Sequence, residues 1–213
     1  MTVYLTSAYL APVSYYVRLL ACDKVWVEQH DHYVKQTYRN RCHIASPNGR
    51  LALSIPIEKA APDCEMKDIR ISSHYRWQHL HWNALVSSYG QTPFFDYYAD
   101  DFRPFYEGTR YAFLMDLNEA LCRLVCRLID LDPVMARTDA YLKVPAAGEV
   151  DDRQAIHPKK EAADDPFFCP QPYYQVFQQR FGFLPDLSIV DLLFNMGPES
   201  LLILQKSLRH AHA

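Results

Sequence analysis

Glycine is scarce and widely spaced in this 213-residue chain, and this excludes several folds that are built around glycine-rich loops. The six glycines are Gly49, Gly90, Gly108, Gly148, Gly182 and Gly197, and no two of them fall within one loop. A dinucleotide-binding turn, a Walker-type phosphate loop and a G-x-S-x-G nucleophile elbow each need glycines within a few residues of one another. The chain therefore contains none of these three devices.

A β-hairpin is the clearest local signal. Residues 41–45 and 51–57 flank Asn48 and Gly49, a dipeptide that adopts positive φ at little cost and is typical of hairpin turns. Apolar and small or polar residues alternate along the second arm, so one face of the hairpin is predicted to be buried. Pro56 cannot donate to a strand ladder and is expected at a sheet edge or strand end.

The order of the other elements predicts an α/β or α+β fold in a single domain over residues 1–213. We expect a mixed β-sheet, with the hairpin in its N-terminal half, flanked by helices and followed by a helical C-terminal part. The expected strands are 2–6, 24–28 and 68–72, and the expected helices are 12–21, 73–89, 111–129, 173–181, 188–195 and 198–208. Helix 73–89 has aromatic residues on two faces and is expected to be covered on both sides.

Residues 145–172 differ in character from the rest of the chain. Charged residues and prolines recur through this stretch, which is predicted to be one long charged loop within the domain. A loop of this length is either functional or flexible.

Charge and hydropathy narrow the choice of partners. The net charge of −3 predicts no nucleic-acid partner, and no apolar run reaches the roughly 20 residues of a membrane span. The N-terminus lacks the features of a signal peptide, so we expect a cytoplasmic protein. The six cysteines form no C-x-x-C pair and are expected to be buried thiols. No cofactor is predicted, and the oligomeric state stays open.

Two groups of residues in the N-terminal part have the spacing of a binding site. Glu28, His30 and His32 would lie on one face of a continuing strand and supply two metal ligands and a base, as in a metal-dependent hydrolase; the alternative is a polar strand end. Arg39 and Arg41, joined by Lys35 if that segment is extended, would hold a phosphate or carboxylate; the alternative is ion pairing with nearby acids.

His81 lies on the predicted helix 73–89, in one stripe with Trp77 and Leu85. It is therefore either a core histidine with a fixed hydrogen bond or a general acid or base that lines a pocket. His79 faces the opposite side of the helix from His81, whereas His74 shares the face of His81 but lies two turns away. These histidines are therefore not expected to bind one metal ion together.

Several motifs together resemble the WbqC-like family of bacterial proteins over nearly the whole chain. These are Tyr9-Leu10-x-Pro12-x2-Tyr15-Tyr16, Asp23-Lys24-Val25, Tyr33-x-Lys35-x4-Asn40-Arg41, Trp77-x3-His81-x7-Tyr89-x2-Thr92-Pro93-Phe94-Phe95-x2-Tyr98, Tyr174-Gln175-x-Phe177 and Phe183-x-Pro185-x-Leu187-Ser188-Ile189-x-Asp191-Leu192-Leu193-Phe194-Asn195-x-Gly197. Members of the family usually open with His-Gln-Pro-x-Tyr-Leu-Pro. The segment Thr6-Ser7-Ala8-Tyr9-Leu10-Ala11-Pro12 lacks both the His and the Gln.

The resemblance implies a protein of surface-polysaccharide biosynthesis that modifies a nucleotide-linked sugar by acyl or aminoacyl transfer. It implies His81 and Asp191 as catalytic residues and an anionic or sugar ligand held by Lys35, Arg39, Arg41, Tyr9, Tyr89 and Asn195. Asp191 has a structural alternative, because Ser188 would cap its helix and place it in the first turn. The missing His and Gln favour a rival hypothesis, a non-catalytic binding or scaffold protein. The enzyme hypothesis gains if His81, Lys35, Arg41 and Asp191 converge on one pocket.

Overall fold

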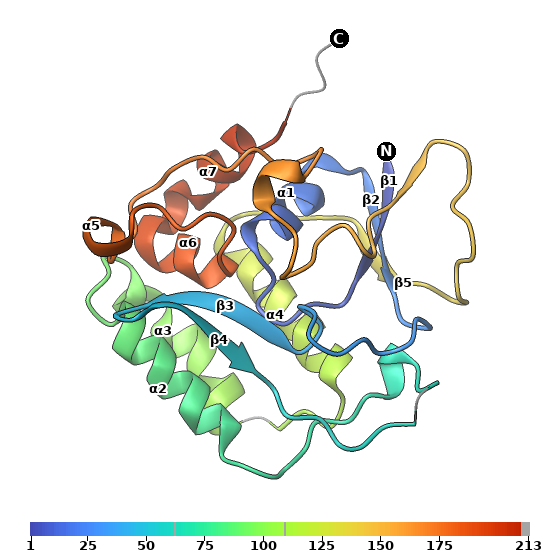
Figure 1. Cartoon of the computed structure of the whole chain (residues 1–213), viewed down its shortest axis with the longest axis horizontal. Helices are drawn as coiled ribbons and strands as arrows, with labels where there is room; N and C mark the ends of the chain where they lie inside the picture. The colour runs from blue at the N-terminus through green and yellow to red at the C-terminus, as the bar shows by residue number, and fades with distance from the viewer. Residues whose placement is uncertain (62, 109, 210–213) are drawn as a thin grey trace.

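A parallel sheet of four strands forms one half of the molecule, and its central strand is the first of the chain. The computed structural model describes residues 1–61, 63–108 and 110–209 (Figure 1). The sheet order is β5-β2-β1-β6, with every neighbouring pair parallel. The strands are β1 Thr2–Thr6, β2 Lys24–Glu28, β3 Arg41–Ser46, β4 Gly49–Ser54, β5 Met135–Arg137 and β6 Glu149–Asp151.

Helices pack around the sheet and the hairpin and include the C-terminal part, as expected. They are α1 Val13–Ala21, α2 Trp77–Tyr89, α3 Phe95–Arg103, α4 Leu114–Leu128, α5 Gln178–Phe181, α6 Ile189–Met196 and α7 Ser200–Lys206. Short 3-10 turns cover Met66–Asp68, Ala162–Asp164 and Gly197–Glu199, and a π turn covers Pro104–Gly108. Within the described ranges, none of the helices has the length and apolar character that crossing a bilayer requires.

The β1–α1–β2 unit builds the centre of the sheet. The middle of β1 is buried, as an inner parallel strand must be, and β1 pairs with β2 from Thr2↔Lys24 to Thr6↔Glu28. On its other side, β1 pairs with β6 from Thr2↔Glu149 to Tyr4↔Asp151. The carboxyl ends of these strands meet at one edge, which is where open α/β sheets bind their ligands.

The predicted hairpin is confirmed as β3 and β4, and it forms a separate two-stranded sheet. Cys42, Ile44 and Leu53 are buried on its inner face. The alternation of a strand places Arg41 and His43 on the opposite face, and Arg50, which pairs with Ala45, shares that face. The hairpin therefore presents a basic outer face, defined here as Arg41, His43 and Arg50.

Two predictions about the middle of the chain are wrong in detail. The segment 68–72 is not a strand: it follows a 3-10 turn and makes only single bridges, Ile71 with Ile57 and Arg70 with Phe113. Helix α2 is not covered on both sides, because Leu80 is 60% exposed and Val86 is 40% exposed. One face of this helix points to solvent although its sequence is apolar on two faces.

The predicted long loop 145–172 contains ordered structure. It includes strand β6, which completes the parallel sheet, and the 3-10 turn Ala162–Asp164. Three residues are too few to show an alternating pattern, so the sequence offered no signal for this strand. The part that follows β6, residues 152–165, is called the basic loop below because it carries His157, Lys159 and Lys160.

Candidate functional site

A pocket of about 240 Å³ lies between the hairpin, the basic loop and the segment before α6. We call it the basic pocket. Its lining consists of Tyr38, Arg50, Pro158, Lys159, Lys160, Glu161, Ala162, Pro185 and Asp186. The cations are Arg50, Lys159 and Lys160, and they outnumber the acids Glu161 and Asp186. Within the described ranges, none of these three cations lies within 4 Å of a carboxylate.

Cationic groups crowd one another next to this pocket. Burial, together with the smaller effects of the Arg50 and Arg41 charges, lowers the pKa of His43 to about 4. Burial also lowers the pKa of His157, with added contributions from Lys159, Lys160 and Arg39. The outer face of the hairpin and residues 157–160 of the basic loop therefore form one electropositive region.

Three buried nitrogen atoms in this region have no partner among the described residues. They are Arg39 Nε, Arg41 Nε and His43 Nδ1. Arg39 is only 2% exposed, so its Nε–H is cut off from bulk water. Buried polar groups are nearly always hydrogen-bonded, and such atoms point to a bound polar or anionic molecule or to ordered water.

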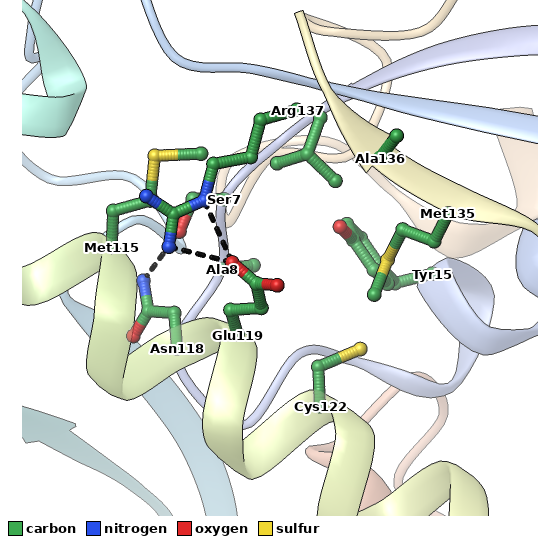
Figure 2. A pocket seen from close by; sticks show the side chains of 11 residues that line it. Ser7, Ala8, Tyr15, Met115, Asn118, Glu119, Cys122, Met135, Ala136 and Arg137 are labelled. Carbon is green, nitrogen blue, oxygen red and sulfur yellow. Dashed lines mark hydrogen bonds and ion pairs between the residues drawn. The ribbon is translucent and has the colours of Figure 1, made fainter.

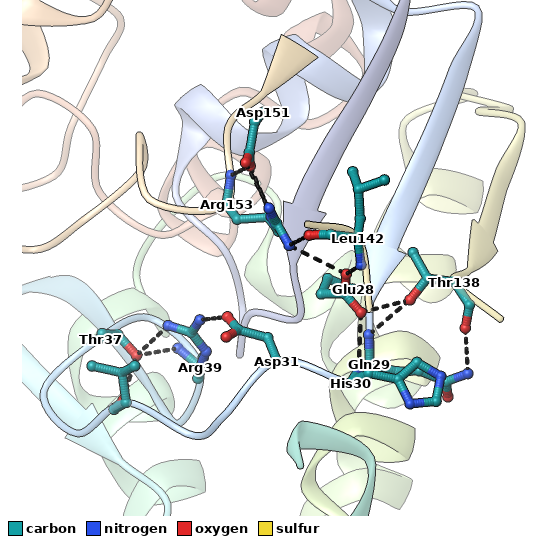
Figure 3. Close-up of polar contacts among 11 residues, drawn as sticks. Glu28, Gln29, His30, Asp31, Thr37, Arg39, Thr138, Leu142, Asp151 and Arg153 are labelled. Atoms are coloured by element: carbon teal, nitrogen blue, oxygen red, sulfur yellow. Dashed lines mark hydrogen bonds and ion pairs between the residues drawn. The ribbon is translucent and has the colours of Figure 1, made fainter. Parts of the chain in front are cut away.

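The three cations that were predicted to act together differ in their exposure and partners. Arg39 forms an ion pair with Asp31 and hydrogen-bonds Thr37 Oγ1, so the ion-pairing alternative holds for this residue (Figure 3). Lys35 is exposed, and no ion pair joins it to a carboxylate of the described ranges. Arg41 is half-buried on the outer face of the hairpin, and it is the predicted cation that faces the electropositive region.

His81 lies in a buried aromatic cluster. Its Nδ1 is 2.9 Å from Tyr9 Oη, which is 2.8 Å from Tyr106 Oη. Trp77 packs edge-on against the imidazole, and His81 is 5% exposed. Burial lowers the pKa of His81 to about 4, so the ring is neutral at pH 7. This is the arrangement of a core histidine with a fixed hydrogen bond.

Asp191 lies in a second buried network. Tyr89 Oη donates to its Oδ1 at 2.9 Å, while Tyr173 Oη and Gln175 Nε2 donate to its Oδ2 at 2.7 and 2.9 Å. Asn195 Nδ2 donates to the Asp191 carbonyl oxygen at 2.7 Å. Burial raises the pKa of Asp191 to about 6. Ser188 caps this helix, as the sequence predicted, by accepting from the Val190 amide at 3.5 Å.

The predicted site residues therefore do not converge. His81 and Tyr9 share one buried cluster, Asp191, Tyr89 and Asn195 share another, and the cations lie elsewhere. Their catalytic and substrate-binding roles stay predictions, and the geometry does not bring His81, Lys35, Arg41 and Asp191 into one pocket.

The metal hypothesis for Glu28, His30 and His32 is not supported. Glu28 lies at the carboxyl end of β2, is fully buried, and accepts from Thr138 Oγ1, the His30 and Leu142 amides, and Arg153 Nη1 at 2.7 to 3.3 Å (Figure 3). The His30 ring faces Glu65, whereas His32 Nδ1 is 3.0 Å from the Asp63 carbonyl oxygen. No group of three metal-ligating side chains with suitable geometry occurs in residues 1–61, 63–108 and 110–209.

A small cavity lies between α4 and strand β5. Figure 2 shows Arg137 and Glu119 at one end of it, paired at 2.7 Å, with Tyr15 and Met135 along the wall. Arg137 also pairs with Asp116 at 2.7 Å, so its charge is neutralised within the protein. The cavity holds about 20 Å³, which is room for roughly one water molecule.

The basic pocket contains residues that the sequence analysis did not connect. Arg50 follows the Asn48–Gly49 turn of the predicted hairpin, and Lys159 and Lys160 lie in the predicted charged loop 145–172. The available signals were the excess of basic residues in the first 50 positions and a loop too long to be a simple connection. His43 and Tyr38 carried no signal, because only the folded hairpin brings them to this region.

Comparisons with known proteins agree with the resemblance in the motifs. The chain is 25% identical to an uncharacterized protein of Mycobacterium tuberculosis over 219 residues, which cover 91% of this chain and 93% of that protein. No solved structure matches. A family model of the WbqC-like protein family matches residues 7–167, which include the hairpin, α2 and the whole basic loop. The chain therefore belongs to the WbqC-like protein family.

Proposed function

We propose that this protein binds a nucleotide-linked sugar in the basic pocket and modifies the sugar, by acyl or aminoacyl transfer, for surface-polysaccharide biosynthesis. The observation that carries the proposal is the unpaired cluster of cations: Arg50, Lys159 and Lys160 line one pocket without carboxylate partners in the described residues. A diphosphate is the group in such a ligand that this cluster would hold, because it presents several anionic oxygens within a few ångströms.

The chemistry of the donors fits a phosphate ligand. The Arg50 Nη2 atom already donates to the Pro185 carbonyl oxygen at 3.0 Å, which orients the guanidinium while leaving its other N–H groups available. Arg forms directional paired hydrogen bonds with phosphate oxygens, whereas Lys acts as a mobile point charge. Arg41 and His43, whose Nε and Nδ1 atoms have no partner among the described residues, lie beside Arg50 on the same face of the hairpin. No glycine-rich loop is needed for this mode of binding.

Binding of small anions tests the first half of the proposal. We would measure binding of UDP, inorganic pyrophosphate and a panel of nucleotide-linked amino sugars by calorimetry. Lys159→Ala/Lys160→Ala is expected to weaken binding by about tenfold, as befits the loss of two charge contacts. Lys59→Ala/Lys143→Ala removes the same charge from exposed positions outside the pocket and is the matched control. Equal effects of the two double variants would refute the pocket as the site.

Turnover tests the second half. The purified protein would be incubated with nucleotide-linked amino sugars and acyl or aminoacyl donors, and products would be identified by mass spectrometry. His81→Gln and Asp191→Asn test the predicted catalytic residues in the same assay. Because both side chains lie in buried networks outside the pocket, a loss of activity counts only where the variant still binds UDP and keeps its melting temperature.

A non-catalytic binding protein is the second candidate. It is favoured by the separation of His81 and Asp191 from the cations, which leaves the pocket without a predicted acid or base. Tight binding of a nucleotide-linked sugar without turnover across the panel of donors would support this alternative.

A further inference from the structure

We propose that Arg18 is a positioning residue of the basic pocket, which holds the basic loop in place so that Lys159 and Lys160 face the ligand. The proposal rests on the proposed function, because it assumes that the pocket binds an anion. Arg18 lies on α1, and its side chain is fully buried. It does not line the pocket itself.

Arg18 forms ion pairs with both ends of the basic loop. Its Nε pairs with Asp152, the first residue of the loop, and its Nη1 and Nη2 each donate to Asp165, the last residue, at 2.9 Å. Paired bonds between a guanidinium and a carboxylate fix direction as well as distance. One side chain therefore bonds both ends of the loop. The first end is also held by the Asp152 amide, which donates to the Tyr4 carbonyl oxygen at 2.9 Å, and by Arg153, which pairs with Glu28 and Asp151.

Few other polar contacts hold the loop between these ends. Within residues 154–164, the hydrogen bonds are local, such as Lys160 Nζ to the Gln154 carbonyl oxygen at 2.8 Å. In the described ranges, the one hydrogen bond that joins this stretch to a residue outside the loop runs from Arg209 Nη2 to the Ala163 carbonyl oxygen, and it is exposed. Ile156 and Ala162 add partial apolar packing.

The same face of α1 also holds the opposite wall of the pocket. Ser14 is one helical turn before Arg18, and residues four apart share a helix face. The Ser14 amide and hydroxyl donate to the two carboxylate oxygens of Asp186 at 2.8 and 2.9 Å, and Asp186 lines the pocket. Arg18 Nη1 donates to the Ser14 carbonyl oxygen at 3.1 Å, which joins the two anchors. One turn of α1, from Ser14 to Arg18, thus bonds both Asp186 on one wall of the pocket and the loop that forms the other wall.

The test changes Asp165, the loop residue that pairs with Arg18, and keeps the buried arginine itself. Asp165→Asn loses the charge-assisted pair, and Asp164→Asn, one residue earlier and exposed, is the matched control for the change in charge. Removing a carboxylate near an anion site strengthens anion binding by simple electrostatics. If Arg18 positions the loop, Asp165→Asn instead weakens pyrophosphate binding, by about tenfold, while Asp164→Asn leaves it equal or tighter.

A second variant and a double-variant cycle separate positioning from a loss of stability. Arg18→Lys keeps the charge but cannot bond both carboxylates, and it is also expected to weaken pyrophosphate binding by about tenfold. When the Asp165→Asn background already misplaces the loop, Lys159→Ala/Lys160→Ala is expected to weaken binding much less than it does in the wild type. A variant that acts only by lowering the melting temperature would leave the effect of the lysine changes unaltered.

The outcomes distinguish this proposal from the proposed function. If the lysine changes weaken pyrophosphate binding but Asp165→Asn and Arg18→Lys do not, the basic pocket stands and the role of Arg18 is refuted. If the cycle is additive, the role is refuted as well. If the wild-type protein binds neither pyrophosphate nor UDP, both proposals fall together.

Discussion

Replacing Tyr173 by phenylalanine removes one of three side-chain hydrogen bonds to the buried Asp191 carboxylate. Tyr173 Oη donates to Asp191 Oδ2 at 2.7 Å, and both residues belong to the interior. A hydrogen bond to a charged group contributes about 1.5–3 kcal/mol to stability. We therefore expect Tyr173→Phe to lower the free energy of unfolding by about 2 kcal/mol at pH 7.5, where Asp191 is ionised.

The loss in the free energy of unfolding caused by Tyr173→Phe is expected to depend on pH, in a direction that follows from the pKa of Asp191. Burial raises this pKa from 3.8 to about 6, so the folded state binds the proton more tightly than the unfolded state. The stabilisation by this proton is complete below pH 3.8 and is lost as the pH rises through 6. At pH 5 the acid is mostly neutral, and a neutral hydrogen bond contributes only about 0.5–1.5 kcal/mol. The cost of Tyr173→Phe should therefore fall by about half.

Urea unfolding of both proteins at pH 7.5 and pH 5 measures this difference. Other groups that titrate in this range are the same in the two proteins, so their effects cancel in the comparison. Tyr97→Phe is the matched control, because Tyr97 is 76% exposed and its hydroxyl bonds no described residue. A cost of Tyr173→Phe that is equal at the two pH values, or larger at pH 5, would show that Asp191 does not carry a charge supported by this hydroxyl.

Three further changes test other parts of the fold. Gly197→Ala places a Cβ atom 2.4 Å from the Phe94 ring at a φ of +55°, and is expected to cost about 1–3 kcal/mol in urea unfolding; Gly148→Ala, which also has positive φ but meets open space, should cost less. Glu28→Gln replaces the carboxylate that accepts from the buried Arg153 guanidinium by an amide. We expect a free energy of unfolding that is lower by about 3–5 kcal/mol, and a lower melting temperature. An unchanged melting temperature would contradict the role of Glu28 in this network. Burial lowers the pKa of His81 from 6.5 in the unfolded state to about 4 in the folded state. As the pH falls from 6.5 to 4, the unfolded state binds a proton at His81 while the folded state does not, and the protein loses stability. The stability advantage of the wild type over His81→Gln should shrink by about 3 kcal/mol from pH 6.5 to pH 4, and a constant advantage would refute this.

The parts of the fold that the sequence predicted correctly depend on neighbouring residues. The Asn48–Gly49 turn determines the hairpin, and Ser188 marks the start of α6, because turn and cap chemistry act within a few residues. Strands β5 and β6 were not predicted. Each has three residues and exists because it pairs with a strand more than 100 residues away. No local pattern can reveal such a pairing.

Little of the candidate site could be predicted from the sequence. The spacing of Lys35, Arg39 and Arg41 predicted a site for an anion, and of these three residues Arg41 lies beside Arg50 on the outer face of the hairpin. Spacing defines which side chains share a face, but it does not say what packs opposite. Arg39 is held by Asp31, whereas the lysines of the pocket come from a loop about 110 residues later. Asp191 and His81 illustrate the same limit: their surroundings, and therefore their pKa values, depend on contacts between distant segments.

The position of β1 at the centre of the sheet has a consequence for how the chain folds. Its two neighbours are β2, which follows at once, and β6, which ends at residue 151. While the chain is being synthesised, β1 and β2 can pair early, but one edge of β1 stays open until most of the protein has emerged. An open, apolar strand edge can pair with other chains. Truncation before β6 is therefore expected to yield a protein that aggregates, even though such a chain keeps the whole β1–α1–β2 unit.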